Sequence, residues 1–155
     1  MNSDTLSKLF SLNVMVIEKN LKGITPDESL FQPRQAGNCV NWVFGHIVAT
    51  RNQVMKIIGE RHVWSQEEAA PYVRGSAPLK DESVALPLSR MLTDLLASQN
   101  KLLTKLHSIS PEELEEPVEN GTVCEQLAIL LFHEAYHAGQ LGILRRLLGK
   151  PGAIK

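Results

Sequence analysis

Residues 122–149 read TVCEQLAILLFHEAYHAGQLGILRRLLG, and this stretch decides the fold class. Thr122 and Glu125 match a capping box, in which the hydroxyl accepts an early backbone N–H and the carboxylate accepts the N–H of the cap residue. Apolar residues and histidines then recur every three or four positions until Gly149 and Pro151 end the run. The stretch predicts one long helix whose inward stripe comprises Leu127, Leu130, His133, His137, Leu141, Leu144 and Leu148.

Three upstream segments repeat with the same period, over residues 6–21, 38–58 and 88–106. Pro87 suits the first position of the third of these helices, because its missing N–H would have no helical partner there. No segment alternates with period two between hairpin turn signals. We therefore expect an all-α protein.

About 25 residues rich in Pro, Gly, Ser and charge separate the second and third predicted helices. A tight helical connection needs far fewer residues, so this length allows the two helices to run parallel. The pattern predicts a four-helix bundle with a long crossover from helix 2 to helix 3.

Length and charge limit the function classes. The 155 residues fit a single domain spanning residues 1–155, with 43% hydrophobic content to build a core. The formal net charge of -1 leaves no basic stripe for nucleic acid. The apolar runs are too short to span a membrane, no secretory signal pattern opens the chain, and two cysteines suit a reducing compartment. We expect a soluble, cytoplasmic protein with no nucleic-acid or membrane partner.

The sequence His133-Glu-Ala-Tyr-His137 matches the H-E-x-x-H pattern of zinc metalloproteases, in which two histidines one turn apart face one metal. Such proteases need a third ligand downstream, and residues 138–155 contain no His, Asp or Glu. We therefore expect no protease of this type. The two imidazoles still lie on one inward face of the helix, where they can form part of another kind of metal site.

Helix 2 offers a third imidazole, because His46 lies on its inward stripe between Val43 and Thr50. A bundle core accommodates metal ligands that project from facing helices. Histidines that only hydrogen-bond one another or a backbone carbonyl are the alternative. His62 and His107 fall in a connection and at a helix end, where we expect exposed side chains.

Two segments carry a family resemblance: NWVFGHI at residues 41–47 and HEAYHAGQL at residues 133–141, followed by LRRLLG at residues 144–149. They resemble the DinB/YfiT-like family of metal-binding four-helix bundles (the DinB-like domain) over nearly the whole chain. The resemblance implies that His46, His133 and His137 bind the metal, that the bundle runs up-down-down-up and that the protein forms a homodimer. The damage-inducible DNA polymerase that shares the name is unrelated.

Three neutral imidazoles would leave a coordination position open, as in catalytic sites. We expect one divalent ion, with zinc or nickel favoured and iron, manganese or copper also compatible. Proteins similar to this family include thiol-dependent transferases and isomerases, so a small thiol or an electrophile is the expected substrate, and metal-dependent hydrolysis is an alternative. A non-catalytic, dimeric metal-binding or regulatory bundle is the main rival.

Several other residues have two interpretations each. Glu134 is either a catalytic base on a metal-bound ligand or a solvated or salt-bridged carboxylate. Gln140 either contacts a ligand or substrate or bonds to a neighbouring helix. Cys39 either approaches the site or, as is more common, packs in the core, and Trp42 is expected in the core rather than as a platform for substrate. The segment from residue 60 to residue 85 is a candidate cover over the pocket.

Overall fold

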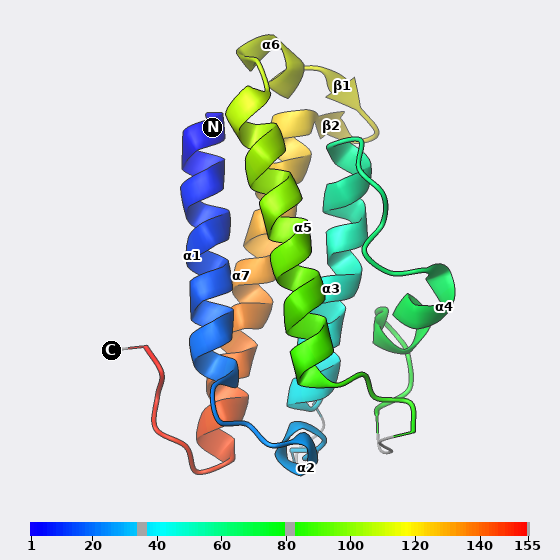
Figure 1. Ribbon diagram of the computed structural model, residues 1–155, viewed down its shortest axis with the longest axis vertical. Coiled ribbons are helices and arrows are strands. Elements are labelled where there is room, and N and C mark those ends of the chain that lie inside the picture. Colours follow the sequence, from blue (N-terminus) through cyan, green and yellow to red (C-terminus); the bar gives the residue numbers. More distant parts are fainter. Residues whose placement is uncertain (34–36, 80–82, 155) are drawn as a thin grey trace.

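Four long helices form the body of the protein in the computed structural model, which describes residues 1–33, 37–79 and 83–154 (Figure 1). α1 spans Ser3–Leu21, α3 spans Val40–Ile57, α5 spans Leu88–Ser108 and α7 spans Val123–Leu147. α1 and α3 each pack against both α5 and α7, so the helices form a four-cornered bundle. The prediction of an all-α protein is confirmed.

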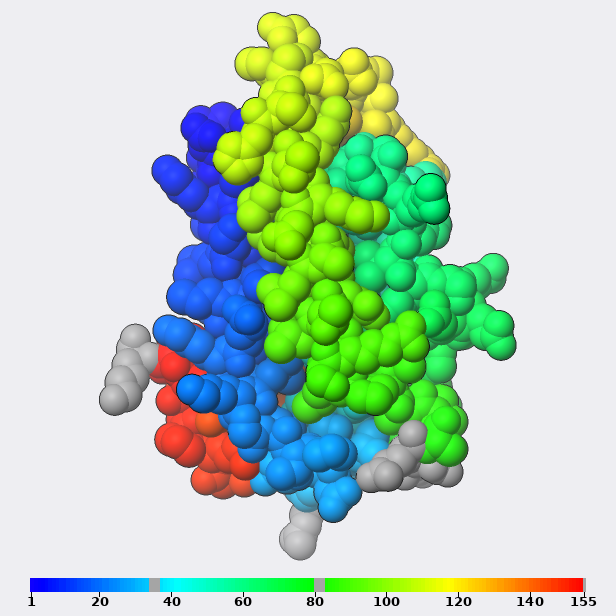
Figure 2. Space-filling view, viewed as in Figure 1, coloured from blue at the N-terminus to red at the C-terminus, as the bar shows by residue number. Residues whose placement is uncertain are grey.

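The directions of the four helices follow from their connections. In Figure 1, α1 and α7 run down the view, whereas α3 and α5 run up it. The short helix α2, Pro26–Ser29, lies between α1 and α3. The longer connection from α3 to α5 contains α4, Gln66–Ala69, and the 3-10 helix η1, Ala70–Tyr72, both of which contact α3. Figure 2 shows α5 covering the front of the bundle between α1 and this connection.

A small hairpin precedes α7. After α6, Pro111–Leu114, the strands β1, Pro117–Val118, and β2, Gly121–Thr122, pair antiparallel. Asn120, which lies between the strands, and Gly121, which begins β2, have φ values of 67° and 134°, which Asn and Gly adopt at low cost in tight hairpin turns. The sequence shows no period-two alternation here, because strands of two residues are too short to carry one.

The helix ends follow local chemistry. Thr122 accepts a hydrogen bond from the N–H of Glu125, and the Glu125 carboxylate accepts one from the N–H of Thr122, so the predicted capping box is present. Cys39 caps α3, where its sulfur accepts a hydrogen bond from the N–H of Trp42. Burial raises the pKa of the Cys39 thiol, which is therefore a packed and neutral group.

The predicted stripes form the core. Leu6, Phe10, Val14, Ile17 and Leu21 of α1 are all buried. On α7, His137 is buried with Leu127, Leu130, Leu141 and Leu144 of the stripe, whereas His133 is half-buried, as is Leu148 just beyond the helix end. Among the described residues, no helix is both long and apolar enough to cross a membrane.

Candidate metal centre

Three histidines meet between α3 and α7. His46 projects from α3, and His133 and His137 project from successive turns of α7. The Nε2 atom of His133 lies 3.1 Å from Nε2 of His46 and 3.1 Å from Nε2 of His137. The three residues could therefore hold one metal ion.

The His46 ring is held on two sides. Its Nδ1 lies 2.7 Å from the backbone oxygen of Tyr72 in η1, and the Trp42 indole stacks on it at 4.9 Å with an interplanar angle of 9°. Trp42 is fixed in turn, since its Nε1 donates to Ser76 Oγ. These contacts orient the imidazole so that Nε2 faces His133.

Gly45 allows η1 to approach α3 closely enough for the Tyr72 carbonyl to reach His46. A Cβ atom on Gly45 would overlap the ring of Tyr72, so only glycine lets that ring lie directly on α3. The Tyr72 hydroxyl donates to Asn41 and accepts from the N–H of Leu86, which fixes the ring at its far end. The Tyr72 carbonyl is thereby placed against His46.

The two α7 histidines differ in the hydrogen bonding of their Nδ1 atoms. Nδ1 of His137 lies 2.8 Å from Oε1 of Gln140 one turn later. Gln140 thus contacts a candidate ligand, the first of the two alternatives considered for it. Nδ1 of His133 is buried and has no hydrogen-bond partner among the described residues.

These contacts determine where the protons lie. A carbonyl oxygen only accepts, so Nδ1 of His46 and Nδ1 of His137 must both carry hydrogen, and their Nε2 atoms present lone pairs. Nε2 of His133 can donate to at most one of these lone pairs. If its proton sits on Nδ1 instead, three lone pairs face one another and the Nδ1–H has no acceptor. A cation that accepts all three lone pairs removes the conflict.

The spacing of the nitrogens suits such a cation. Bonds of about 2.0–2.1 Å to imidazole nitrogen place two ligands about 2.9 Å apart at a right angle and about 3.4 Å apart at a tetrahedral angle. The observed 3.1 Å lies between these limits. Two of the three nitrogen pairs are therefore spaced like neighbouring ligands of a four- to six-coordinate ion, and the three ligand atoms all lie within 4.8 Å of one another.

Burial keeps the histidines neutral. It lowers the pKa of His46 and of His137, and it lowers the pKa of His133 to about 4, where the charges of the other two histidines add to the effect. A neutral imidazole is the form that binds metal, so no proton has to be displaced near neutral pH.

Glu134 forms an ion pair with the α3 residue Arg51. Its carboxylate accepts two hydrogen bonds from the guanidinium, at 2.6 and 3.0 Å, and both side chains are buried. The guanidinium also lies over the Phe10 ring at 5.1 Å. Of the two interpretations of Glu134, this contact matches the salt bridge. A role as catalytic base stays an untested prediction, and the ion pair argues against it.

A cavity of about 850 Å³ opens beside the histidines. His46 and His133 line it together with residues of the α3–α5 connection. The segment proposed as a cover thus borders the pocket, although its residues 80–82 lie outside the described part of the chain. His62 is exposed as expected, but it also lines this cavity.

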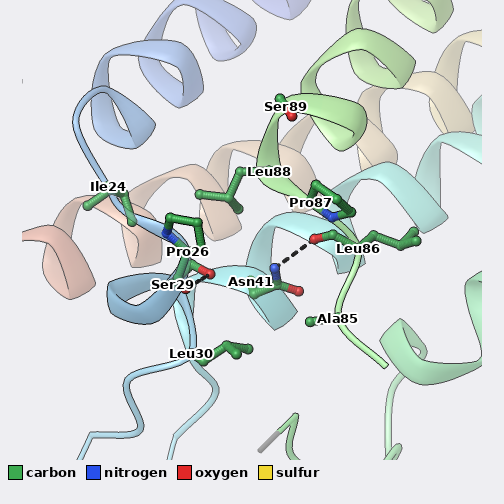
Figure 3. A pocket seen from close by; sticks show the side chains of 10 residues that line it. All are labelled: Ile24, Pro26, Ser29, Leu30, Asn41, Ala85, Leu86, Pro87, Leu88 and Ser89. Atoms are coloured by element: carbon green, nitrogen blue, oxygen red, sulfur yellow. Dashed lines mark hydrogen bonds between the residues drawn. The ribbon is translucent and has the colours of Figure 1, made fainter. Parts of the chain in front are cut away.

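A second cavity of about 400 Å³ lies near the start of α5 (Figure 3). The described residues that line it are mostly apolar and include no histidine or charged side chain. The Asn41 amide donates to the Leu86 carbonyl and accepts from the Tyr72 hydroxyl, so it is already paired. This cavity presents no reactive group, which leaves the histidine cluster as the candidate functional site.

A family comparison agrees with this geometry. The model of the DinB superfamily matches residues 10–141, which include all three histidines. The chain belongs to the DinB superfamily. The resemblance found in the sequence is confirmed. The comparison with curated proteins finds no match.

A solved structure supports the fold of this DinB superfamily member. A conserved protein from Enterococcus faecalis superposes with a TM-score of 0.74 over 97% of this chain and 99% of its own. The two sequences are 20% identical. At that identity, the likeness shows the shared fold alone.

Sequence reasoning placed the three histidines but missed what surrounds them. The Tyr72 carbonyl is a backbone group that no motif marks. The Gly45 next to His46 was the available signal, because a glycine inside a helix indicates the close approach of another group.

Proposed function

We propose that this protein binds one divalent metal ion through His46, His133 and His137 and acts as a metal-dependent enzyme on a small thiol or electrophile. The observation that carries the proposal is the convergence of Nε2 atoms beside an open cavity. Zinc or nickel is favoured as the ion, and iron, manganese or copper also suits imidazole ligands.

Each residue around the ion has a distinct task. The three imidazoles bind it, while the Tyr72 carbonyl and Gln140 hold two of the rings in the required tautomer. When bound, such an ion acidifies a water or thiol placed at its open position. The neutral histidines leave the ion's charge uncompensated, which favours an anionic partner.

The cavity lining favours the same charge. Arg74 lines the cavity and has no ion-pair partner among the described residues, and His62 lines it as well. None of the described residues that line the cavity is Asp or Glu. We therefore propose a substrate that carries a carboxylate or another anionic group in addition to its thiol or electrophilic centre.

Glu134 is left out of the proposed chemistry. Both of its oxygens accept hydrogen bonds from Arg51, so a proton on Glu134 would break a buried ion pair. In this proposal a metal-bound group, and not Glu134, serves as the base.

The proposal also covers the assembly and the topology. The up-down-down-up arrangement is supported by the shared direction of α3 and α5. A homodimer is supported by apolar side chains that α7 exposes. A cytoplasmic location agrees with two buried free cysteines.

Metal analysis tests the site. Protein without a histidine tag is exposed to zinc and to nickel, dialysed and analysed for metal, as wild type, His133→Ala and His107→Ala. We expect about one ion per chain in wild type and in His107→Ala, since His107 is exposed and distant, and little in His133→Ala. No metal in wild type, or equal loading of wild type and His133→Ala, would overturn the site.

Activity assays distinguish an enzyme from a non-catalytic bundle. Metal-loaded protein is assayed for addition of mercaptoacetate to an electrophile and for hydrolysis of an activated ester. A metal-dependent rate with thiol supports the transferase, and a rate without thiol supports the hydrolase. Stoichiometric metal with no rate in either assay favours a non-catalytic metal-binding or regulatory bundle.

A further inference from the structure

α7 presents an uncharged face to solvent. Between Gln126 and Leu144 its one charged residue is Glu134, which is buried against Arg51. The face itself carries five large apolar or aromatic side chains, each more than half exposed: Ile129, Phe132, Tyr136, Ile143 and Leu147. A helix that is apolar on its inner and outer sides is expected to be covered on both.

These residues follow a regular spacing. With Gly139, which is also exposed, they occupy positions 129, 132, 136, 139, 143 and 147, separated by three or four residues. This is the spacing of a helix-packing seam, and we call these six positions the α7 seam. α1 continues the seam at its edge, because Val16 borders the same groove as Gly139 and Ile143.

The covered area would be large enough for a stable contact. Phe132 and Tyr136 alone would bury on the order of 250 Å². The whole seam with its α1 border reaches the scale of about 800 Å² that one partner of a standard interface buries. An exposed apolar patch of this extent is unusual on a monomer.

Two copies of the α7 seam have complementary charges when they run antiparallel. Glu125 lies just before it and Arg146 at its far end, so two antiparallel copies bring opposite charges together at both ends. A parallel pairing would instead place Glu125 against Glu125 and Arg146 against Arg146. In the reversed pairing centred on Tyr136, the large Phe132 also faces the small Gly139.

We propose that the protein dimerises through the α7 seam, with α7 of a second copy antiparallel to it and the two-fold axis beside Tyr136. Ile129 then lies against Ile143 of the second copy. Since Ile129 also lines the cavity next to His133, the second copy forms part of the cavity's border. This inference rests on the proposed homodimer and adds its surface and geometry.

Mass measurement tests the surface. Sedimentation equilibrium is run on wild type, Phe132→Glu and Phe31→Glu, the last being a matched control because Phe31 is exposed after α2 and is not part of the α7 seam. We expect dimers for wild type and Phe31→Glu and a loss of affinity of at least tenfold for Phe132→Glu. A monomeric wild type overturns both the homodimer and the seam. A dimer that Phe132→Glu leaves unchanged overturns the seam alone.

Disulfide formation tests the geometry. Under diamide, Tyr136→Cys should cross-link to itself. Ile129→Cys should not, whereas Ile129→Cys mixed with Ile143→Cys should cross-link. The native cysteines are buried, so wild type gives the background. Efficient self-linking of Ile129→Cys would show parallel helices and overturn the antiparallel arrangement. Metal content, measured on the same samples, reports the histidine site separately.

Discussion

The ring of Tyr72 lies directly against the α-carbon of Gly45, where no other residue leaves room for it. This contact joins the α3–α5 connection to the turn of α3 that carries His46. The neighbouring Tyr72 carbonyl then receives the Nδ1 proton of that histidine. A residue without a side chain thus determines how a candidate ligand is oriented.

Gly45→Ala should therefore weaken metal binding without removing a ligand. The added methyl group displaces the Tyr72 ring, and the carbonyl moves away from His46. Loss of such an orienting contact costs about 10–100-fold in metal affinity. Competition with a chromogenic chelator measures the change. Gly142→Ala is the control, because a Cβ there meets Asn20 only at ordinary contact distance. Metal affinity that falls equally in both variants would contradict this mechanism.

Acid should destabilise the metal-free protein through the histidines. The pKa of His133 is lowered to about 4 in the folded state, against about 6.5 in an unfolded chain. Between these values the unfolded state binds a proton that the folded state does not, so stability falls as the pH decreases from about 6.5 toward 4. Urea unfolding at several pH values measures this trend.

His133→Ala provides the matched comparison for the pH series. It removes the residue with the large pKa shift, so stability should depend less steeply on pH between about 4 and 6.5. His107→Ala, an exposed site, should keep the wild-type dependence. Parallel curves for wild type and His133→Ala would show that another group causes the loss.

Glu134→Ala should destabilise the fold while leaving the ligands in place. The substitution leaves the Arg51 guanidinium buried without its counter-charge, which costs about 3–5 kcal/mol in free energy of unfolding. Replacing both partners, as Arg51→Met with Glu134→Leu, should recover most of that loss. Denaturant unfolding measures both variants. A double variant as unstable as Glu134→Ala would mean that lost packing is the cause.

Arg74→Gln should reduce affinity for anionic thiols selectively. Arg74 is exposed at the cavity wall, so its contribution is that of a screened charge, about three- to fivefold in affinity. Cobalt-loaded protein is titrated with mercaptoacetate and with neutral 2-mercaptoethanol while the absorption of the bound thiolate is followed. Only the affinity for mercaptoacetate should decrease. Arg61→Gln serves as the control, and equal losses for both thiols would argue against an anionic substrate.

Much of the fold is readable from local sequence patterns. Thr122 and Glu125 mark the start of α7 because a capping box uses only neighbouring residues. The apolar stripe of α1 predicts its buried face for the same reason. The Asn120-Gly121 hairpin was missed because its strands are too short to carry a periodic signal.

The site is less predictable, because its parts come from distant segments. His133 and His137 share one helix face, whereas His46 was assigned partly by elimination and partly by family resemblance. The Arg51–Glu134 pair could not be foreseen, since charged residues are rarely buried and each is common on exposed helix surfaces. Its formation depends on the packing of α3 against α7.

Metal binding at this site would also report on the progress of folding. The sequence separation of 87 residues between His46 and His133 means that a growing chain can assemble the cluster only after α7 has been synthesised and packed against α3. All three histidines can therefore bind one ion only once α7 has packed against α3. In a cell, loading through all three histidines would distinguish folded molecules from incomplete chains, which lack one or more of these ligands.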